Sequence, residues 1–338
     1  MSSALGVAVI GCGYWGPNLV RNFNAAAGGA ARLVCDRDRS RLAHMRSLYP
    51  GLDAAEDAQA AFDRADIDAV AIATPAGTHF VLAERALRAG KHVFVEKPLA
   101  TRAAECERLI ELAREHRRIL MVGHTFLYCE PVRMIRDAIA RGDLGDLLTI
   151  NSRRLSLGLI QNDINAAWDL APHDISIILN LLGESPSTVN CQGQSALAGG
   201  VEDVVNLSLK FNSGLFATIQ ASWIHPNKVR ELTVVGSRRM LVYDDVEPLE
   251  KIRIYDKRVE SPAHHDTFAD FQYAYHYGDT YCPYIKLVEP LAVECRHFLE
   301  CIRENKTPLS DGENGLAVVR VLEAANESLR RDGAAVRL

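Results

Sequence analysis

Three side chains in this sequence could perform acid–base chemistry on a hydroxyl group. Asp169 and His173 lie four residues apart in the stretch WDLAPHDIS, so both can face the same side of a helix. An imidazole, with an unperturbed pKa of about 6.5, can take a hydroxyl proton and return it near neutral pH. Lys97 follows the apolar run HVFV, so its ammonium is held at the end of a buried strand, where it could stabilise a developing alkoxide. Together with a hydride acceptor, this set could oxidise a secondary alcohol.

Each of these residues also has an ordinary structural explanation. Asp169 suits the N-cap of a helix, because Pro172 is tolerated in a first helical turn and therefore predicts a helix that begins at or near Asp169. A single histidine is often a structural residue, and a single lysine often closes a strand at the surface. Trp168 could stack on a sugar face or lie in the core.

A hydride acceptor is indicated by GCGYWG, residues 11 to 16, which follows an apolar strand and opens a helix. In this setting Gly11 permits the tight turn and Gly13 lets the backbone approach a pyrophosphate. Gly16 allows the helix to pack closely on the strand, and the free N–H groups at the helix start bind the anion. Tyr14 and Trp15 belong to the same predicted cofactor-binding loop.

The second strand ends in Asp36 and Arg37. A carboxylate there accepts hydrogen bonds from a ribose 2′-hydroxyl and repels a 2′-phosphate, so Asp36 favours NAD. Arg37 could accommodate a phosphate, which keeps NADP open as the less favoured cofactor. TPAGTH and EKP follow two further strands at their C-terminal ends, where ligands bind in open α/β sheets. The cofactor-binding residues predicted from these stretches are Thr74, Pro75, His79, Glu96 and Lys97.

The elements that must position these residues alternate between strand and helix in the first half of the chain. Apolar runs of strand length recur at Val7–Ile10, Leu33–Cys35, Ala69–Ala73, His92–Val95 and Ile119–Gly123. Helical patterns lie between them at Pro17–Ala27, Ser40–Leu48, Thr78–Ala89 and Arg102–His116. Such alternation predicts an α/β Rossmann domain, a doubly wound parallel sheet covered by helices on both faces.

The second half predicts a different architecture. Strand patterns fall at Leu147–Leu155, Val204–Phe211, Leu215–Trp223, Arg230–Val235 and Met240–Tyr243, several of them separated by short turns. This spacing favours an antiparallel meander. Helical patterns are expected at Val132–Arg141, Pro290–Glu304 and Gly315–Arg330. A length of 338 residues favours two domains, which we place at 1–125 and 126–338.

The bulk composition excludes several classes of protein. A formal net charge of -5 gives no electrostatic reason to expect nucleic acid as a partner. No apolar run approaches the roughly 18 residues that cross a bilayer, and the N-terminus lacks the basic start of an export signal. The eight cysteines are scattered and never form CxxC, which argues against disulfides and a metal site. We therefore expect a cytoplasmic protein.

The motifs GCGYWG, Asp36, TPAGTH, EKP and WDLAPHD together resemble the glucose–fructose oxidoreductase/inositol dehydrogenase/MocA-like (Gfo/Idh/MocA) family over nearly the whole chain. The resemblance implies an N-terminal NAD-binding Rossmann domain and a C-terminal α/β domain with a large, mostly antiparallel sheet. In that family the sheet often forms the subunit interface, so a homodimer or homotetramer is expected. Members resembling sugar or aminoglycoside 3-dehydrogenases carry the same motif set.

The resemblance also implies the catalytic residues, which are Lys97, Asp169 and His173 in this sequence. His173 would be the base in the oxidative direction, Lys97 would hydrogen-bond the same oxygen, and Asp169 would bind a neighbouring hydroxyl or orient the site. The family's usual motif has a glycine before the histidine and an acid three residues after it, where this chain has Ala171 and Ser176. Asp174 follows the histidine directly, and its role is left open. The residues predicted to contact substrate are Arg154, Asp163, Trp168, Asp169 and His173.

Two kinds of sugar substrate fit the charges of the second half. A nucleotide sugar needs cations, for which Arg153, Arg154, Lys228 and Arg230 are candidates. An amino sugar or aminoglycoside needs carboxylates, for which Asp163, Asp169, Asp174 and Asp279 are candidates. The stretch QNDINAAWDLAPHD leans towards the cationic substrate, although Asp and Asn also serve as caps and turn residues. The product would be a 3-keto sugar in a biosynthetic pathway.

Two other functions occur on the same fold. Some of its members bind NAD as regulators without chemistry, and others use NAD transiently to cleave glycosides. The regulators typically lose the lysine or the histidine, whereas Lys97, Asp169 and His173 are all present here. We therefore predict a dehydrogenase that acts on a secondary hydroxyl of a sugar, with the other two functions as alternatives.

Overall fold

A computed structural model describes residues 4–27, 29–158, 160, 164–197, 200–260 and 274–338. The chain forms two compact units, each described here by itself. The first comprises Met1–Cys129 and Val288–Glu323, and the second comprises Glu130–Leu287 and Ala324–Leu338. The domain boundary predicted at residue 125 did not include this return of Val288–Glu323 to the first unit.

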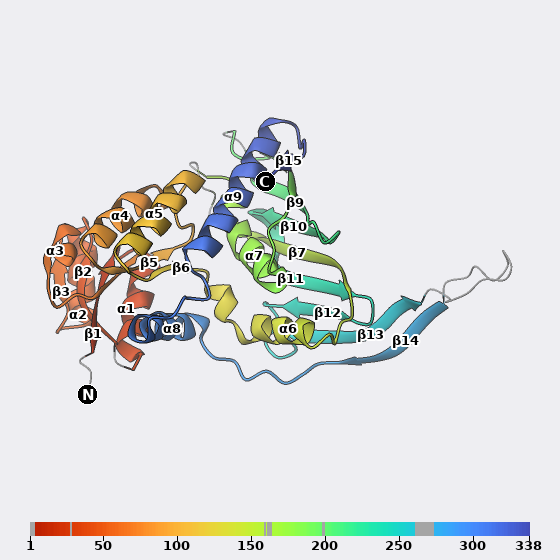
Figure 1. Ribbon diagram of the computed structural model, residues 1–338, viewed down its shortest axis with the longest axis horizontal. Coiled ribbons are helices and arrows are strands. Elements are labelled where there is room, and N and C mark those ends of the chain that lie inside the picture. The colour runs from red at the N-terminus through yellow and green to blue at the C-terminus, as the bar shows by residue number, and fades with distance from the viewer. Residues whose placement is uncertain (1–3, 28, 159, 161–163, 198–199, 261–273) are drawn as a thin grey trace. The chain divides into compact units, whose positions relative to one another are not determined.

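The first unit contains a sheet in which all pairs of neighbouring strands are parallel, with the order β3-β2-β1-β4-β5-β6 in the described residues. Its strands are β1 (Leu5–Ile10), β2 (Gly29–Cys35), β3 (Asp53–Ala55), β4 (Ala69–Ile72), β5 (His92–Glu96) and β6 (Leu120–Gly123). The sheet confirms the predicted Rossmann domain (Figure 1). The sequence did not predict β3, because three residues without an apolar run leave no strand pattern.

Helices accompany this sheet, as the periodic segments predicted. They are α1 (Gly16–Ala25), α2 (Arg39–Leu48), α3 (Gln59–Asp63), η1 (Ala76–Thr78), α4 (His79–Arg88), α5 (Ala103–Glu115), η2 (Thr125–Tyr128), α8 (Pro290–Glu304) and the start of α9 (Gly312–Arg330). Phe23 of α1, Phe94 of β5 and Phe298 of α8 pack edge to face, with ring centroids 5.8–6.3 Å apart. The late helix α8 therefore completes the core of the first unit.

The second unit contains a sheet whose described strands follow the order β14-β13-β12-β11-β7-β10-β9-β8-β15. Its elements are α6 (Glu130–Ala140), β7 (Leu147–Leu157), α7 (Ala166–Leu182), β8 (Thr188–Gln194), β9 (Val204–Lys210), β10 (Phe216–Ser222), β11 (Ile224–Gly236), β12 (Met240–Asp244), β13 (Ile252–Glu260), β14 (Ala274–Tyr281) and β15 (Val336–Arg337). In the described part of this sheet, all neighbouring strand pairs are antiparallel except β7 with β10. The predicted mostly antiparallel sheet is confirmed, with one parallel pair at its centre.

Helix α7 packs on one face of this sheet, over β7, β9 and β10. The side chains on that face are buried, as Ile150, Leu207 and Ile219 illustrate with exposures of 0–1%. On the opposite face, strands β7 and β10 present the partly exposed side chains of Asn151 and Thr218, which hydrogen-bond to each other at 2.8 Å. The sheet is therefore apolar towards α7 and more polar on the other side.

Three expectations from composition can be compared with the described part of the chain. All eight cysteines are free thiols, seven of them buried. No group of three or more His, Cys, Asp or Glu side chains is arranged to hold a metal ion among the described residues. None of the helices described is long and apolar enough to cross a membrane.

Candidate active site and cofactor pocket

The first unit contains a cavity of about 1040 Å³ at the C-terminal ends of β1, β2 and β4. This is the edge of an open parallel sheet at which dinucleotides bind. Of the predicted cofactor-binding residues, Gly11, Gly13, Asp36, Arg37, Thr74 and Pro75 line it, and further lining residues that the motifs did not indicate are Arg41, Glu56, Asp57, Val81 and Arg85. The glycine loop and the strand ends therefore meet around one cavity.

The glycines of the loop have distinct reasons for lacking a side chain. Gly11 adopts a φ of +96°, and a Cβ there would lie 2.5 Å from the Ala73 carbonyl oxygen. A Cβ on Gly16 would lie 2.1 Å from the Gly11 carbonyl oxygen, so α1 could not pack on the loop. A Cβ on Gly13 would meet only the Arg41 Nη1, at 3.8 Å. The space beside Gly13 is what a pyrophosphate approaching the backbone requires.

Asp36 is held rigidly at the end of β2. Its Oδ2 accepts a hydrogen bond from the Cys12 backbone N–H at 2.7 Å, and its Oδ1 accepts one from the Asp38 N–H at 2.9 Å. The guanidinium of Arg41 lies 3.7 Å from Oδ2. A carboxylate so placed on the cavity wall fits the two hydroxyls of a ribose, in agreement with the prediction of NAD.

Three other predicted cofactor residues lie away from this cavity wall. Tyr14 and Trp15 are 82% and 39% exposed and pack edge to face, 5.3 Å apart. His79 is 1% exposed, and its ring nitrogens lie 2.8 Å from the carbonyl oxygens of Pro98 and Thr74. Burial lowers the pKa of His79, and the two carbonyl contacts oppose that shift. His79 therefore links the TPAGTH loop to the EKP loop from a buried position, and it does not line the cavity.

The EKP loop places a charged residue beside buried ones. Lys97 is half-buried and precedes Pro98 through a cis peptide bond, whereas Glu96 is only 7% exposed. Burial raises the pKa of Glu96 to about 7, against the opposing effect of the Lys97 charge. Burial, followed by the Lys97 charge, lowers the pKa of His124 to about 3. Glu96, which was predicted from the sequence to bind the cofactor, is therefore a buried residue that does not line the cavity.

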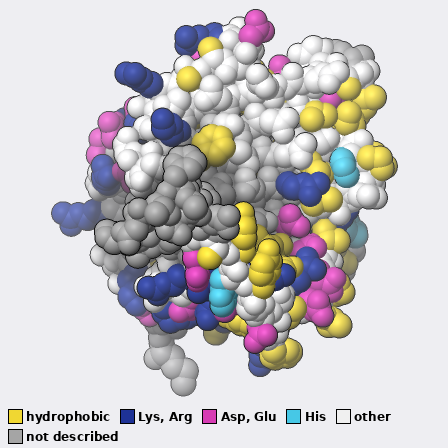
Figure 2. Space-filling model, turned by 90° about the vertical axis from the view of Figure 1, so that its right-hand side faces the viewer, with side chains coloured by type: hydrophobic (Ala, Val, Ile, Leu, Met, Phe, Trp, Pro, Cys, Tyr) yellow, Lys and Arg dark blue, Asp and Glu magenta, His cyan; other side chains and the backbone are white. Residues whose placement is uncertain are grey.

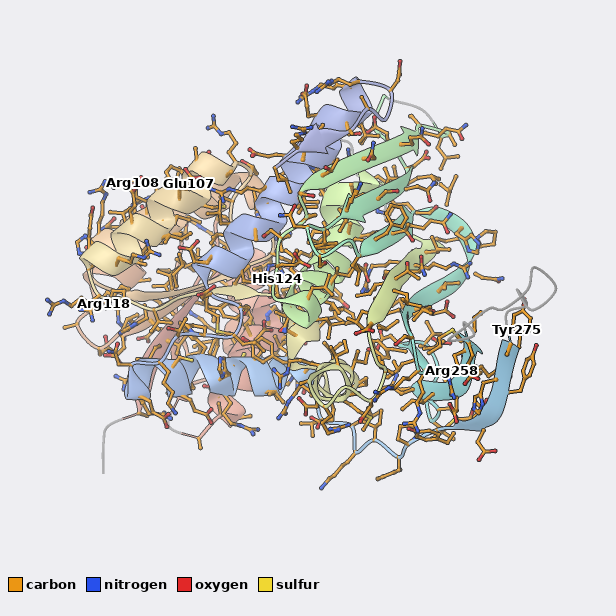
Figure 3. All side chains as sticks on the ribbon, turned by 45° about the vertical axis from the view of Figure 1, so that its right-hand side comes forward. Glu107, Arg108, Arg118, His124, Arg258 and Tyr275 are labelled. Atoms are coloured by element: carbon orange, nitrogen blue, oxygen red, sulfur yellow. The ribbon has the colours of Figure 1, made fainter. Side chains whose placement is uncertain are left out.

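A second buried carboxylate, that of Glu294 on α8, lies in the same interior cluster as Glu96 and His124. His124 is labelled in Figure 3. Burial raises the pKa of Glu294, the charge of Glu96 raises it further, and a 2.7 Å hydrogen bond from Thr125 opposes both. Among the described residues, Glu96 Oε1, Glu294 Oε1 and both ring nitrogens of His124 have no hydrogen-bond partner. His124 was not predicted, although its place directly after strand β6 could have indicated it, and nothing in the sequence indicates Glu294, about two hundred positions after Glu96.

Replacing Glu96 with Gln should change how stability depends on pH. The folded-state pKa of about 7 lies above the ordinary 4.5, so the folded protein retains a proton that the unfolded chain releases. Wild-type stability therefore falls as the pH rises from about 4.5 to about 7, by about 3 kcal/mol. Chemical unfolding of Glu96→Gln from pH 4.5 to 8 should lack most of this fall. The exposed Glu111→Gln serves as control, and equal slopes for Glu96→Gln and wild type would contradict the prediction.

In the second unit, Asp169 and His173 lie on α7, four residues apart as predicted. Both are partly exposed, whereas Ala171, Pro172 and Asp174 around His173 are buried. Asp169 Oδ2 accepts a hydrogen bond from the Trp223 indole Nε1 at 2.9 Å. The helix therefore buries most of its residues and leaves Asp169, Leu170 and His173 partly exposed in its first turns.

The predicted start of this helix is wrong by about one turn. Asn165 is the N-cap, its side chain accepts from the Trp168 N–H at 3.2 Å, and Asp169 lies inside the helix. Pro172 therefore occupies the second helical turn, where it leaves the carbonyl of Trp168 without its helical donor. The long apolar stretch that follows stabilises the helix by burial and outweighs this loss.

The remaining residues predicted to contact substrate lie in the second unit, and those that the structure describes are buried. Arg154 is 6% exposed and forms an ion pair with Asp174, from Nε to Oδ2 at 2.6 Å. Trp168 is 8% exposed, as a core residue would be. Asp163 lies outside the described residues. Trp223, which holds Asp169, was not predicted, because only the fold places β10 beside α7.

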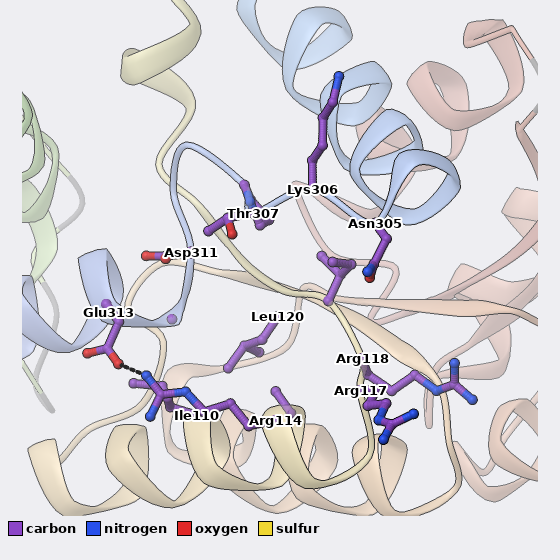
Figure 4. Close-up of a pocket in the computed structure, with 14 residues that line it drawn as sticks. Ile110, Arg114, Arg117, Arg118, Leu120, Asn305, Lys306, Thr307, Asp311 and Glu313 are labelled. Atoms are coloured by element: carbon purple, nitrogen blue, oxygen red, sulfur yellow. Dashed lines mark hydrogen bonds and ion pairs between the residues drawn. The ribbon is translucent and has the colours of Figure 1, made fainter.

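A smaller cavity of about 420 Å³ lies elsewhere in the first unit, between α5, α9 and the segment after α8 (Figure 4). Its Arg114 pairs with Glu313 at 2.6 Å, and its Lys306 pairs with Glu304. The residues predicted to bind cofactor or substrate do not line it. It is therefore separate from the cofactor pocket.

Comparisons with known proteins agree with this geometry. A family model described as an oxidoreductase family with an NAD-binding Rossmann fold matches residues 5–124, and one described as the GFO/IDH/MocA C-terminal domain matches residues 132–242. UDP-N-acetylglucosamine 3-dehydrogenase of Acidithiobacillus ferrooxidans is 28% identical over 328 residues, 94% of each chain. Inositol 2-dehydrogenase of Rhizobium meliloti is 28% identical over 280 residues, 78% of this chain and 79% of that protein.

Solved structures show the same fold. The A. ferrooxidans enzyme superposes with a TM-score of 0.81 at 25% identity, covering 98% of this chain and 99% of its own. GenD2 from gentamicin A biosynthesis, in complex with NAD, superposes with a TM-score of 0.83 at 22% identity, covering 100% of this chain and 97% of its own. The Rossmann sheet, the glycine loop and the two matching family models together show that this chain belongs to the Gfo/Idh/MocA family of NAD-binding oxidoreductases.

Proposed function

We propose that this protein interconverts a secondary hydroxyl and a ketone on a sugar. The observation that carries the proposal is the placement of Asp169 and His173 on α7, most of whose residues are buried. Among the partly exposed residues of this helix, Asp169 and His173 are the two whose side chains can exchange a proton. Lys97, at the end of β5, supplies the third expected group.

NAD supplies the hydride acceptor at its nicotinamide ring. In the proposed oxidation, His173 takes the proton of the reacting hydroxyl, and it returns that proton in the reductive direction. The ammonium of Lys97 hydrogen-bonds the same oxygen and stabilises its negative charge. Asp169, held by Trp223, accepts a hydrogen bond from a neighbouring hydroxyl and so orients the sugar.

The substrate class is proposed from the relatives and from the charges of the second unit. One relative is named for oxidising a nucleotide-linked amino sugar at carbon 3, and one structural neighbour belongs to aminoglycoside biosynthesis. Arg154 and Asp174 pair with each other, so neither remains as a candidate for binding a charged substrate. We propose a nucleotide sugar or an amino sugar as substrate, oxidised to the 3-keto product.

A substrate panel tests this function. The purified protein is incubated with NAD and UDP-N-acetylglucosamine, an aminoglycoside or myo-inositol, and NADH absorbance is followed. A dehydrogenase accumulates NADH together with a product two mass units lighter than its substrate. An NAD-dependent glycosidase gives a cleaved sugar without net NADH, and a regulator binds NAD without turnover. Either of these outcomes would overturn the proposal.

We also propose that the chain assembles into a homodimer or homotetramer through its large sheet, as the family resemblance implies. The face opposite α7 carries side chains such as Thr149, Asn151 and Thr218. Hydrophobic side chains are interspersed with charged ones on the face of the molecule shown in Figure 2. Exposed Tyr275, labelled in Figure 3, lies on β14 at the edge of the sheet. Light scattering should give a multiple of 37.2 kDa, and a monomer would contradict this.

A further inference from the structure

A buried link joins α7 to β7 immediately beside His173. Asp174 is 3% exposed, and its Oδ1 accepts hydrogen bonds from Ser152 Oγ at 2.7 Å and from Arg154 Nη2 at 3.1 Å. Its Oδ2 accepts from Arg154 Nε at 2.6 Å. Burial acts to lower the pKa of Arg154, but the charge and hydrogen bonds of Asp174 overcome this and raise it. Both oxygens of the carboxylate are therefore used inside the protein.

The strand side of this link is rigid. Ser152 and Arg154 are two residues apart on β7, so their side chains point to the same face of the sheet, towards α7. Strand β7 is central and is paired with β10 on one side and β11 on the other. Because a guanidinium presents its donors as a planar fork, it accepts a carboxylate in few orientations. The third turn of α7 is thus fixed to the middle of the sheet.

This link constrains the rotation of the helix about its axis, in addition to the hydrogen bond from Trp223 to Asp169. Consecutive residues project about 100° apart around a helix, so the direction of Asp174 sets the direction of His173. The other buried side chains near it, such as Ile175 and Ile178, make apolar contacts that do not depend on direction. A buried ion pair also contributes little to net stability compared with apolar residues of similar size. The pair adds directional hydrogen bonds between α7 and β7, which apolar residues cannot form.

We propose that Arg154 and Asp174 are positioning residues that aim His173, with Ser152 as the third member of the link. The inference rests on the proposed function, in which His173 moves the hydroxyl proton. It reassigns Arg154 from substrate contact to support of the helix, and it gives Asp174 a role that the sequence left open.

The test replaces both charges with apolar side chains in Arg154→Met/Asp174→Leu. No unpaired charge remains buried, so the melting temperature should stay within about 4 °C of wild type. A small misplacement of a catalytic group can cost on the order of 100-fold, so kcat should fall at least ~10-fold on the substrate from the panel, with KM for NAD within about twofold. The exposed pair Arg141 and Asp143 provides the matched control, Arg141→Met/Asp143→Leu, which should retain wild-type kcat.

A second measurement is independent of turnover. Diethyl pyrocarbonate modifies neutral imidazoles, and peptide mass spectrometry measures its rate at His173 relative to exposed His44. This ratio should rise severalfold in Arg154→Met/Asp174→Leu, because a released helix exposes His173, and should not change in the control. If the panel finds no substrate, the proposed function fails and the labelling ratio alone decides this inference.

Unchanged kcat together with an unchanged labelling ratio in a folded Arg154→Met/Asp174→Leu protein would overturn the inference. Arg154→Lys covers the case in which the double variant does not fold, since it keeps the charge and loses the fork. It should lower kcat about threefold to tenfold, in line with partial loss of positioning, and a wild-type kcat there would count against the inference as well.

Discussion

Lys97→Met and His173→Ala, made separately, should each lower kcat at least ~1,000-fold while leaving the dissociation constant of NAD within about threefold of wild type. A positioned acid–base group contributes about 100- to 10,000-fold, and an oxyanion donor contributes a comparable factor. In the proposed reaction His173 moves the proton and Lys97 stabilises the oxygen from which it leaves. Neither residue lines the NAD cavity of the first unit, so cofactor affinity should persist.

Single-turnover kinetics and NAD titration by calorimetry measure both quantities. The exposed residues Lys286 and His44 give matched controls, Lys286→Met and His44→Ala, which should turn over at the wild-type rate. The double variant Lys97→Met/His173→Ala should lose little more than either single variant, because both groups act on the same step. Wild-type turnover in both single variants would remove these residues from the mechanism.

Two glycine-to-alanine changes should separate the stability of the loop from its binding of cofactor. In Gly16→Ala the new Cβ would lie 2.1 Å from a backbone oxygen of Gly11, so the loop and α1 must move apart. We expect the free energy of unfolding to fall by about 1–3 kcal/mol, the typical range for overpacking a buried site. In Gly13→Ala the Cβ enters open space, and stability should change by less than about 1 kcal/mol.

For the affinity of NAD, the larger effect should come from Gly13→Ala, the variant whose stability changes little. A methyl group at Gly13 occupies the place where a pyrophosphate meets the backbone, so Gly13→Ala should raise the dissociation constant of NAD ~100-fold or more in a stably folded protein. Urea unfolding and calorimetric titration measure the two effects. If Gly13→Ala binds NAD as tightly as wild type, the cofactor does not approach the loop as proposed. If Gly16→Ala is as stable as wild type, the close packing of the loop does not limit stability.

The sequence predicted the parts of the fold that depend on local patterns. The apolar runs located β1, β4, β5 and β6, because a strand buried on both faces is apolar along its length. The spacing from the glycine motif to Asp36 located a carboxylate that lines the same cavity, because both follow consecutive parallel strands, and its binding to ribose stays a prediction. The start of α7 could not be predicted, since the sequence rule for Pro172 is local and the burial that overrides it is tertiary.

The candidate site shows the same division. Asp169, His173 and Lys97 were predicted as catalytic residues from residue type, spacing and the family resemblance, and this assignment stays a prediction, whereas their supporting partners were not predicted. Trp223 reaches Asp169 across 54 positions, and Arg154 reaches Asp174 across 20. Such pairs form because a strand and a helix pack together, and the sequence pattern of one segment does not indicate which residue of the other it will contact. Arg154 was consequently predicted to bind substrate, although its guanidinium holds Asp174.

The return of α8 to the first unit has a consequence for biosynthesis. The strands of the Rossmann sheet leave the ribosome well before Phe298, which packs on Phe23 and Phe94 and is made about two hundred residues after Phe94. Until then the nascent unit exposes an aromatic surface that a chaperone must shield or that invites aggregation. A recombinant fragment cut at residue 125 would keep that surface permanently, so the NAD-binding half should be expressed with residues 288–323 joined to it.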